Sequence, residues 1–164
     1  MSRESSIEYG LKSEVYNRVV EFWSKAQGVF NFTDKFPKVD FTLKGAVGGQ
    51  AQDGDLIRIN VAFLKNNKEH YLKHTIGHEL AHNITHIVYG GKAKAHGNEW
   101  KSVMVRMGLE PSRTHNYSLQ GIVPIYPYKC GCRTWELTKH RHIKVMNGSK
   151  YICPHCKNIV VKDF

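Results

Sequence analysis

Hydrophobic residues recur at helical spacing in three stretches, which predict the main helices of the fold. The first, Ser13–Ala26, places apolar residues every three or four positions, as one face of an amphipathic helix requires. The second runs from about Lys68 to Tyr89 and stops at Gly90-Gly91, a typical helix end. The third has Asn98 as its predicted N-cap and ends at Gly108.

Apolar and polar residues alternate in two shorter stretches, which predict strands. Val39–Leu43 alternates in this way, and Leu56–Val61 repeats the pattern after the turn signal Asp53-Gly54-Asp55. We therefore expect a small antiparallel sheet and an α+β fold. The glycine-rich stretch Gly45–Gly49 lacks the Lys-Ser/Thr ending of a phosphate-binding loop, so we interpret it as a turn or bulge.

The prolines near position 125 predict a domain boundary. Pro124 and Pro127 precede a cysteine-bearing segment, so we expect an α+β domain over residues 1–126 and a small module over residues 127–164.

The composition indicates a folded rather than a disordered chain, with 41% hydrophobic and 23% charged residues. No apolar run is long enough to span a membrane and no secretory signal is apparent. We expect a cytoplasmic monomer.

Positive charge is concentrated at the C-terminal end. The formal net charge is +10, and residues 128–164 hold eight Lys and Arg against two acidic residues, a net of +6. Such a field attracts polyanions, above all nucleic acid. A solvated basic surface without a partner is the alternative interpretation.

The second helical stretch contains the sequence His78-Glu79-Leu80-Ala81-His82, an H-E-x-x-H pattern. Residues four apart on a helix are separated by about 40° around its axis, so both imidazoles reach one ion from a single face. A carboxylate beside them can take a proton from a zinc-bound water. We predict that His78 and His82 bind a catalytic zinc and that Glu79 is the general base.

Five histidines stand four residues apart on this helix, and only one adjacent pair can be the catalytic pair. The 40° step accumulates to about 160° between His70 and His86, so all five cannot share one ion. His78 alone is followed by a carboxylate. We therefore interpret the other three as supporting or solvated residues: His70, His74 and His86.

A third ligand must come from beyond the glycine stop, because a tetrahedral site needs a ligand outside the first helix. His96 precedes the third helical stretch, and a turn back at Gly90-Gly91 brings it over the histidine pair. Gly97 permits a close approach. His115, after the third stretch, is a candidate for stabilising an oxyanion, although a packing or capping role is the favoured alternative.

Several motifs together resemble the SprT family of zinc metallopeptidases, which includes the Spartan-type DNA-protein crosslink proteases. They are Gly49-Gln50-Ala51 leading to Leu56–Asn60, the H-E-x-x-H sequence, His96-Gly97-x-x-Trp100-Lys101, Arg113-Thr114-His115 and the terminal cysteines. The resemblance implies a zincin-like domain whose zinc ligands are His78, His82 and His96 and whose catalytic glutamate is Glu79. It also implies substrates that are proteins bound to DNA.

The four cysteines predict a second, structural zinc in a zinc-ribbon module. They form two close pairs, and four thiolates on zinc can hold together a module too small to fold on its core alone. Trp135–Thr138 and Ile143–Met146 are predicted to pair as strands through Asn147-Gly148. Because the first pair has C-x-C spacing, His140 or His155 remain alternative ligands. The cysteines are Cys130, Cys132, Cys153 and Cys156.

Cations and an aromatic ring in this module form a candidate nucleic-acid interface without sequence readout, since no recognition-helix pattern occurs there. Cations suit phosphates, and a ring suits unpaired bases. The residues are Lys139, Arg141, Lys144, Lys150 and Trp135. The favoured function is a zinc endopeptidase acting on DNA-bound proteins. The alternatives are a non-enzymatic nucleic-acid-binding protein with two structural zincs and a peptidase indifferent to DNA.

Overall fold

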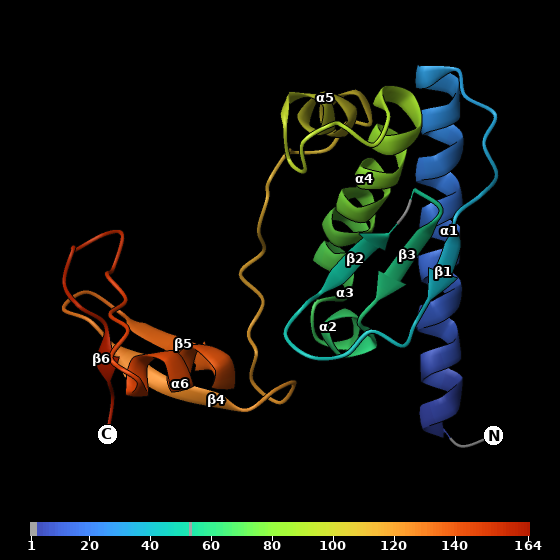
Figure 1. Ribbon diagram of the computed structural model, residues 1–164. Coiled ribbons are helices and arrows are strands. Elements are labelled where there is room, and N and C mark those ends of the chain that lie inside the picture. The colour runs from blue at the N-terminus through green and yellow to red at the C-terminus, as the bar shows by residue number, and fades with distance from the viewer. Residues whose placement is uncertain (1–2, 53) are drawn as a thin grey trace. The chain divides into compact units, whose positions relative to one another are not determined.

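The computed structural model describes residues 3–52 and 54–164, which form two compact units joined between Tyr117 and Ser118 (Figure 1). The predicted boundary at residue 126 falls inside strand β4 (Ile125–Lys129), so the second unit begins earlier than predicted. Asp53, part of the predicted turn, lies outside the described residues. Within the described part of the chain, no helix has the length and apolar character needed to cross a membrane.

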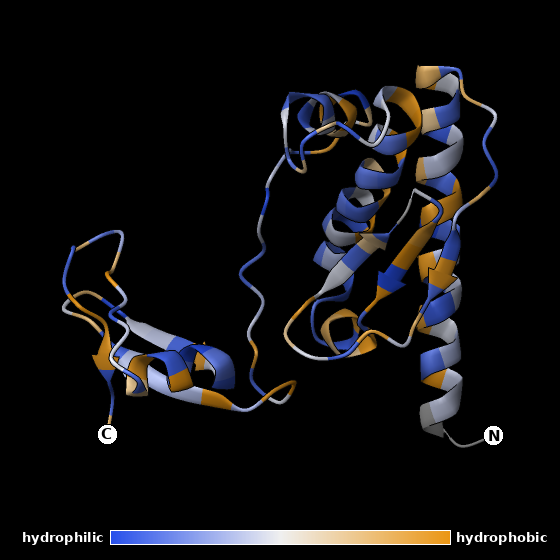
Figure 2. Ribbon diagram, in the orientation of Figure 1, coloured by the Kyte–Doolittle hydropathy of each residue, from blue (hydrophilic) through white to orange (hydrophobic). Residues whose placement is uncertain are grey.

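Helix α1 (Arg3–Phe30) opens the first unit and is longer than the predicted Ser13–Ala26 helix. Its buried side chains follow helical spacing and pack toward α4, and Figure 2 shows apolar and polar residues distributed around it. Tyr16 and Val20, although apolar, are exposed on its outer side. The residues facing the core are Leu11, Val15, Val19, Phe22, Trp23 and Ala26.

A three-stranded sheet follows, in the order β1-β3-β2. β1 (Lys38–Asp40) runs parallel to β3 (Leu56–Ile59), and β2 (Gly49–Gln52) runs antiparallel to β3. The prediction of a purely antiparallel sheet was therefore wrong. The loop between β1 and β2 carries the chain to the far edge of β3, so β1 and β2 never pair. β2 was not predicted, because its sequence Gly-Gln-Ala-Gln contains no β-branched or aromatic residue.

The predicted second helix is present but is not uniform. α2 (Val61–Asn66), which was not predicted, begins where the Asn60 side chain accepts a hydrogen bond from Ala62 N–H. The helical run then passes through α3 (Lys68–His70), a π-helical turn η1 (Tyr71–Thr75) and α4 (Ile76–Tyr89). Such wide turns are frequent at functional sites. α4 ends at Gly90, whose positive φ of 81° suits glycine.

Helix α5 (Asn98–Arg106) packs against α4 through buried Trp100 and Met104. The prediction of Asn98 as N-cap was wrong. Gly97 holds that position with extended backbone, and no side chain caps the helix. The chain turns away after α5 at Gly108, which has a φ of 77°.

The second unit contains a sheet in the order β5-β4-β6 and one helix. β4 pairs with β5 (Thr134–Thr138) and with β6 (Val161–Lys162), and α6 spans Lys139–Met146. The predicted strand at Ile143–Met146 was wrong, because these residues end α6. The chain reverses in a tight turn from Cys130 to Arg133, so β5 pairs with β4, the strand before it. Asn147-Gly148 ends helix α6 instead of forming a hairpin.

Candidate metal centres

Three histidines of the first unit converge on one point. His78 and His82 lie on successive turns of α4, and His96 lies in the loop before α5. The Nε2 atoms are 3.2 Å apart between His78 and His82, 3.1 Å between His82 and His96, and 3.0 Å between His78 and His96. The structure therefore brings together the three histidines that the sequence singled out as one possible metal site.

The donor set fits a zinc ion. Zinc–nitrogen bonds of about 2.0–2.1 Å in a tetrahedral arrangement separate two nitrogens by about 3.3 Å, close to the spacing found. Burial lowers the pKa of His78 to about 4 and that of His82 to about 3, with further lowering by neighbouring imidazoles. These imidazoles are therefore neutral at pH 7, and their Nε2 lone pairs can face a cation.

Neighbouring groups orient the imidazoles. The Ser112 carbonyl lies 3.2 Å from His78 Nδ1. Because a carbonyl only accepts, Nδ1 carries the proton and Nε2 is left as the donor to a metal. Trp100 is fully buried, and its ring centroid lies 4.8 Å from those of His78 and His96 and 5.5 Å from that of His82. Contacts from α4, from α5 with the loop before it, and from Ser112 thus hold the three imidazoles in place.

Glu79 points from α4 toward strand β2. Its side chain is 8% exposed, and the N–H of Ala51 donates to its carboxyl group. Burial raises the pKa of Glu79 to about 7. A Cβ atom on Gly49 would lie 2.9 Å from Glu79 Cγ, so the strand approaches the carboxyl group where it has no side chain. Glycine at this position makes room for Glu79.

A cleft of about 450 Å³ contains both Glu79 and the three histidines. Strand β2 contributes one wall through Gly49–Gln52, and Ala95 and His96 come from the loop before α5. The α4 residues that line the cleft are His78, Glu79, His82, Asn83 and His86. β2 is an edge strand of the sheet and pairs only with β3 among the described strands.

The remaining histidines of the first unit are placed apart from this trio. His70 and His74 stack with ring centroids 4.3 Å apart, and His70 Nδ1 lies 2.7 Å from the Tyr117 hydroxyl. His115 stacks on Tyr117 at 3.9 Å and lies against Gly48. His86 is exposed at the end of the cleft.

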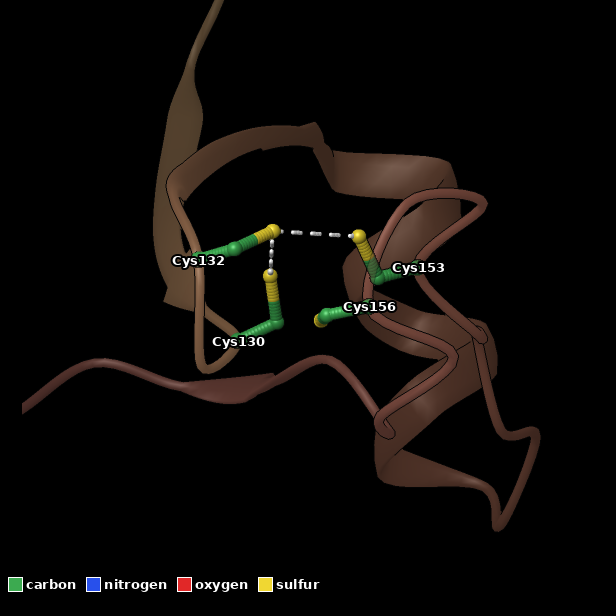
Figure 3. Close-up of side chains that lie close together, drawn as sticks. All are labelled: Cys130, Cys132, Cys153 and Cys156. Carbon is green, nitrogen blue, oxygen red and sulfur yellow. Dashed lines mark hydrogen bonds between the residues drawn. The ribbon is translucent and has the colours of Figure 1, made fainter.

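The four cysteines of the second unit form another possible metal site. Their sulfurs all lie within 4.8 Å of one another, and Cys132 Sγ is 3.6 Å from both Cys130 Sγ and Cys153 Sγ (Figure 3). Zinc–sulfur bonds of about 2.3 Å in a tetrahedron separate sulfurs by about 3.8 Å. Asn158 packs against the C-x-C turn where it has no side chain, since a Cβ on Gly131 would lie 2.8 Å from Asn158 Nδ2. The thiols come together without His140 or His155.

The predicted nucleic-acid residues divide into two groups. The cations are exposed, on α6 or just after it, and none of them forms a salt bridge within the described part of the chain. They are Lys139, Arg141, Lys144 and Lys150. Trp135 instead is half-buried, and its indole N–H donates to Cys130 Sγ at 3.3 Å, which lowers the pKa of that thiol. Its ring supports the cysteine site rather than the exposed cationic surface.

Sequence reasoning missed the contributions of Ser112, Ala51 and Tyr117. The first two act through main-chain groups, which leave no side-chain signal. Tyr117 contacts the π-helical turn, because its hydroxyl lies 3.0 Å from Thr75 Oγ1. The motif Arg113-Thr114-His115, noted in the sequence, lies beside this residue and was the one available indication.

An α+β unit with three convergent histidines and a glutamate on one helix defines a candidate metal-binding protein of the H-E-x-x-H type. The sequence profile of the SprT-like family matches residues 19–117, and the chain belongs to this family. It is 33% identical to Protein SprT of Pseudomonas putida strain F1 over 156 residues, covering 92% of this chain and 95% of the relative.

Another relative gives similar values. Protein SprT of Pseudomonas entomophila strain L48 is 35% identical over 149 residues, covering 88% of this chain and 91% of the relative. No solved structure matches the chain. The similarity therefore spans both units of the structure.

Proposed function

We propose that this chain is a zinc-dependent endopeptidase acting on proteins that are bound or crosslinked to DNA. The observation that carries the proposal is the convergence of three imidazoles beside a buried carboxyl group in one cleft. Membership of the SprT-like family supports it. A second zinc, held by the four cysteines, is structural.

The residues of the cleft have separate tasks. His78, His82 and His96 would hold the zinc, and a zinc bound there would lower the pKa of the attacking water. The carboxylate of Glu79 accepts a proton as water attacks the scissile carbonyl, and the protonated group then delivers it to the departing amine nitrogen. The chain thus supplies both the base and the acid.

Strand β2 is suited to holding the substrate. One of its edges pairs with β3, and Ala51 N–H donates to Glu79 at the cleft. A peptide in extended conformation can add to such an edge by main-chain hydrogen bonds. This binding mode depends little on side chains, which suits an enzyme whose substrates share DNA attachment rather than one sequence.

The DNA part of the proposal rests on the second unit. Its net positive charge is concentrated in exposed side chains, including three cations on α6. Cations that are not engaged by carboxylates can bind phosphates, and such binding is independent of base sequence. The protease would in this way be held near proteins attached to DNA.

The direct test is cleavage of a basic protein bound to single-stranded DNA, by the wild type and by Glu79→Gln. We expect the variant to retain zinc and to lose at least about a hundredfold in cleavage rate, because its ligands remain and only the proton acceptor is lost. Glu110→Gln, an exposed glutamate of the same unit, is the control and should cleave as the wild type does. Equal cleavage by wild type and Glu79→Gln would exclude the proposed mechanism.

A further inference from the structure

The four cysteines of the second unit differ in how far the protein covers them. Cys153 is fully buried in the small core of this unit, and the half-buried Cys130 and Cys156 pack against that core. Cys132 is exposed. Figure 3 shows Cys130 and Cys132 on one turn of the chain, opposite Cys153 and Cys156. A small reagent in solution therefore reaches Cys132 most easily.

The two cysteines of the C-x-C turn also differ in the groups that donate to their sulfurs. The Trp135 indole N–H donates to Cys130 Sγ at 3.3 Å. The main-chain N–H groups of Cys132 and Arg133 donate to the same sulfur. For Cys132 Sγ, the contacts within the described residues are with neighbouring sulfurs, at 3.6 Å from Cys130 Sγ and Cys153 Sγ. Because an N–H donor withdraws electron density from a thiolate, Cys132 has the more nucleophilic sulfur of this turn.

Neighbouring groups hold the Trp135 indole in the orientation that its hydrogen bond needs. The ring packs against the small core, and Arg133 lies over it with Cζ 5.8 Å from the ring centroid. Trp135 lies on β5 opposite Tyr128 of β4, which is fully buried. An indole N–H only donates, so Cys130 Sγ is the acceptor. This arrangement suits a metal-bound thiolate, which has no proton to give.

We infer that Cys132 is the cysteine of this site that soft electrophiles modify first, and that Trp135 is a positioning residue that makes Cys130 less reactive. The inference rests on the structural zinc of the proposed function. With a haloacetamide, the Cys132 thiolate forms a sulfur–carbon bond while the carbon–halogen bond breaks and halide leaves. Because the thiolate is the form that binds metal, the resulting thioether is a weaker ligand, and modification of Cys132 favours loss of zinc.

The test treats zinc-loaded protein with a limiting amount of iodoacetamide and follows the initial rate at each cysteine by mass spectrometry after digestion. For the wild type we expect Cys132 to react about tenfold faster than Cys130, as one hydrogen bond to a charged sulfur allows. Trp135→Phe keeps an aromatic ring without the N–H, and should raise the rate at Cys130 alone. Tyr151→Phe, which alters another ring packed on the same core, is the control and should keep the wild-type order.

Two results would overturn the inference. The first is a wild type in which Cys130 reacts as fast as Cys132. The second is equal acceleration at all four cysteines in Trp135→Phe, which would show that the ring only stabilises the module. Metal analysis of the untreated samples tests the proposed function separately. A cysteine site without zinc would contradict the proposed structural zinc, whereas bound zinc with uniform reactivity would contradict this inference alone.

A spectroscopic readout depends neither on thiol modification nor on hydrolysis. When Co²⁺ replaces zinc, the energy of the thiolate-to-cobalt charge-transfer band rises if a sulfur accepts a hydrogen bond, because the donor stabilises the sulfur electrons. Trp135→Phe should therefore shift this band to longer wavelength, and Tyr151→Phe should leave it in place. An unshifted band in Trp135→Phe would overturn the role of Trp135.

Discussion

Gly49 shows how a single residue without a side chain can position a functional group. The strand passes so close to Glu79 that a methyl group at this position would lie 2.9 Å from both Glu79 Cγ and Thr75 Cγ2. Contacts this short force a neighbour to move. One of the two neighbours is the side chain that we propose as the general base, and it is approached at both Cγ and Oε1.

We therefore expect Gly49→Ala to reduce cleavage at least tenfold while leaving the zinc content unchanged, because displacement of a catalytic group by even 1 Å is costly and the three histidines are untouched. Zinc content and kcat/KM, measured on one preparation, check this. Gly10→Ala is a matched control, since a Cβ there meets nothing within 4 Å. A fully active Gly49→Ala enzyme would show that Glu79 tolerates displacement.

The spacing of residues predicted the convergence of His78, His82 and His96 because two of these lie on one helix and the third follows a glycine break. Spacing could not predict Ala51 or Ser112, whose contributions are a main-chain N–H and a main-chain carbonyl. A local sequence pattern shows which side chains are present. It does not show where the main chain of a segment far away in the sequence passes.

At the scale of elements, the two errors in the sheets have a common cause. The parallel pairing of β1 with β3 depends on how a loop crosses to the far strand edge, and the pairing of β5 with β4 depends on the tight Cys130–Arg133 turn. Neither pairing is encoded in the alternation of a strand itself. The π-helical turn before α4 was also missed, because it changes the helical phase without interrupting the apolar pattern.

Helix α6 makes a separate prediction about nucleic acid. Replacing its three exposed cations, Lys139, Arg141 and Lys144, by alanine should weaken binding of single-stranded DNA. The slope of log affinity against log salt should become shallower by about 2, since each lost phosphate contact removes about 0.7. Fluorescence anisotropy at several salt concentrations measures this.

The control for α6 replaces three lysines of the first unit that pair with glutamates, and so removes the same net charge. These are Lys12, Lys65 and Lys68. Because they are already engaged, their loss should change the salt slope little. If both triple variants weaken binding equally, general charge attraction rather than α6 accounts for the affinity.

At the scale of the whole molecule, the two units depend on metal to different degrees. The first buries an extensive apolar core between α1, the sheet, α4 and α5, whereas the second buries only Tyr128, Leu137, Cys153 and Val160. A core this small contributes little stability without a metal. Zinc binding to the cysteines should therefore supply most of the folding free energy of the second unit.

Cys132→Ser should lower the zinc content from two ions per chain to one and make residues 118–164 sensitive to proteolysis, while the first unit stays resistant. Metal analysis and limited proteolysis followed by mass spectrometry measure both effects. His155→Ala is the control, since this exposed histidine lies outside the cysteine group and should retain both ions. A second unit that stays resistant without its metal would show that its small core suffices.

The most direct test of the account is a zinc titration of metal-free protein, with bound metal and peptide cleavage followed in the same sample for the wild type and Glu79→Gln. We predict that both proteins bind two zinc ions per chain and that only the wild type gains activity, in step with filling of the histidine site. Activity in both proteins, or a single ion bound by the cysteines with the histidines unoccupied, would contradict the account.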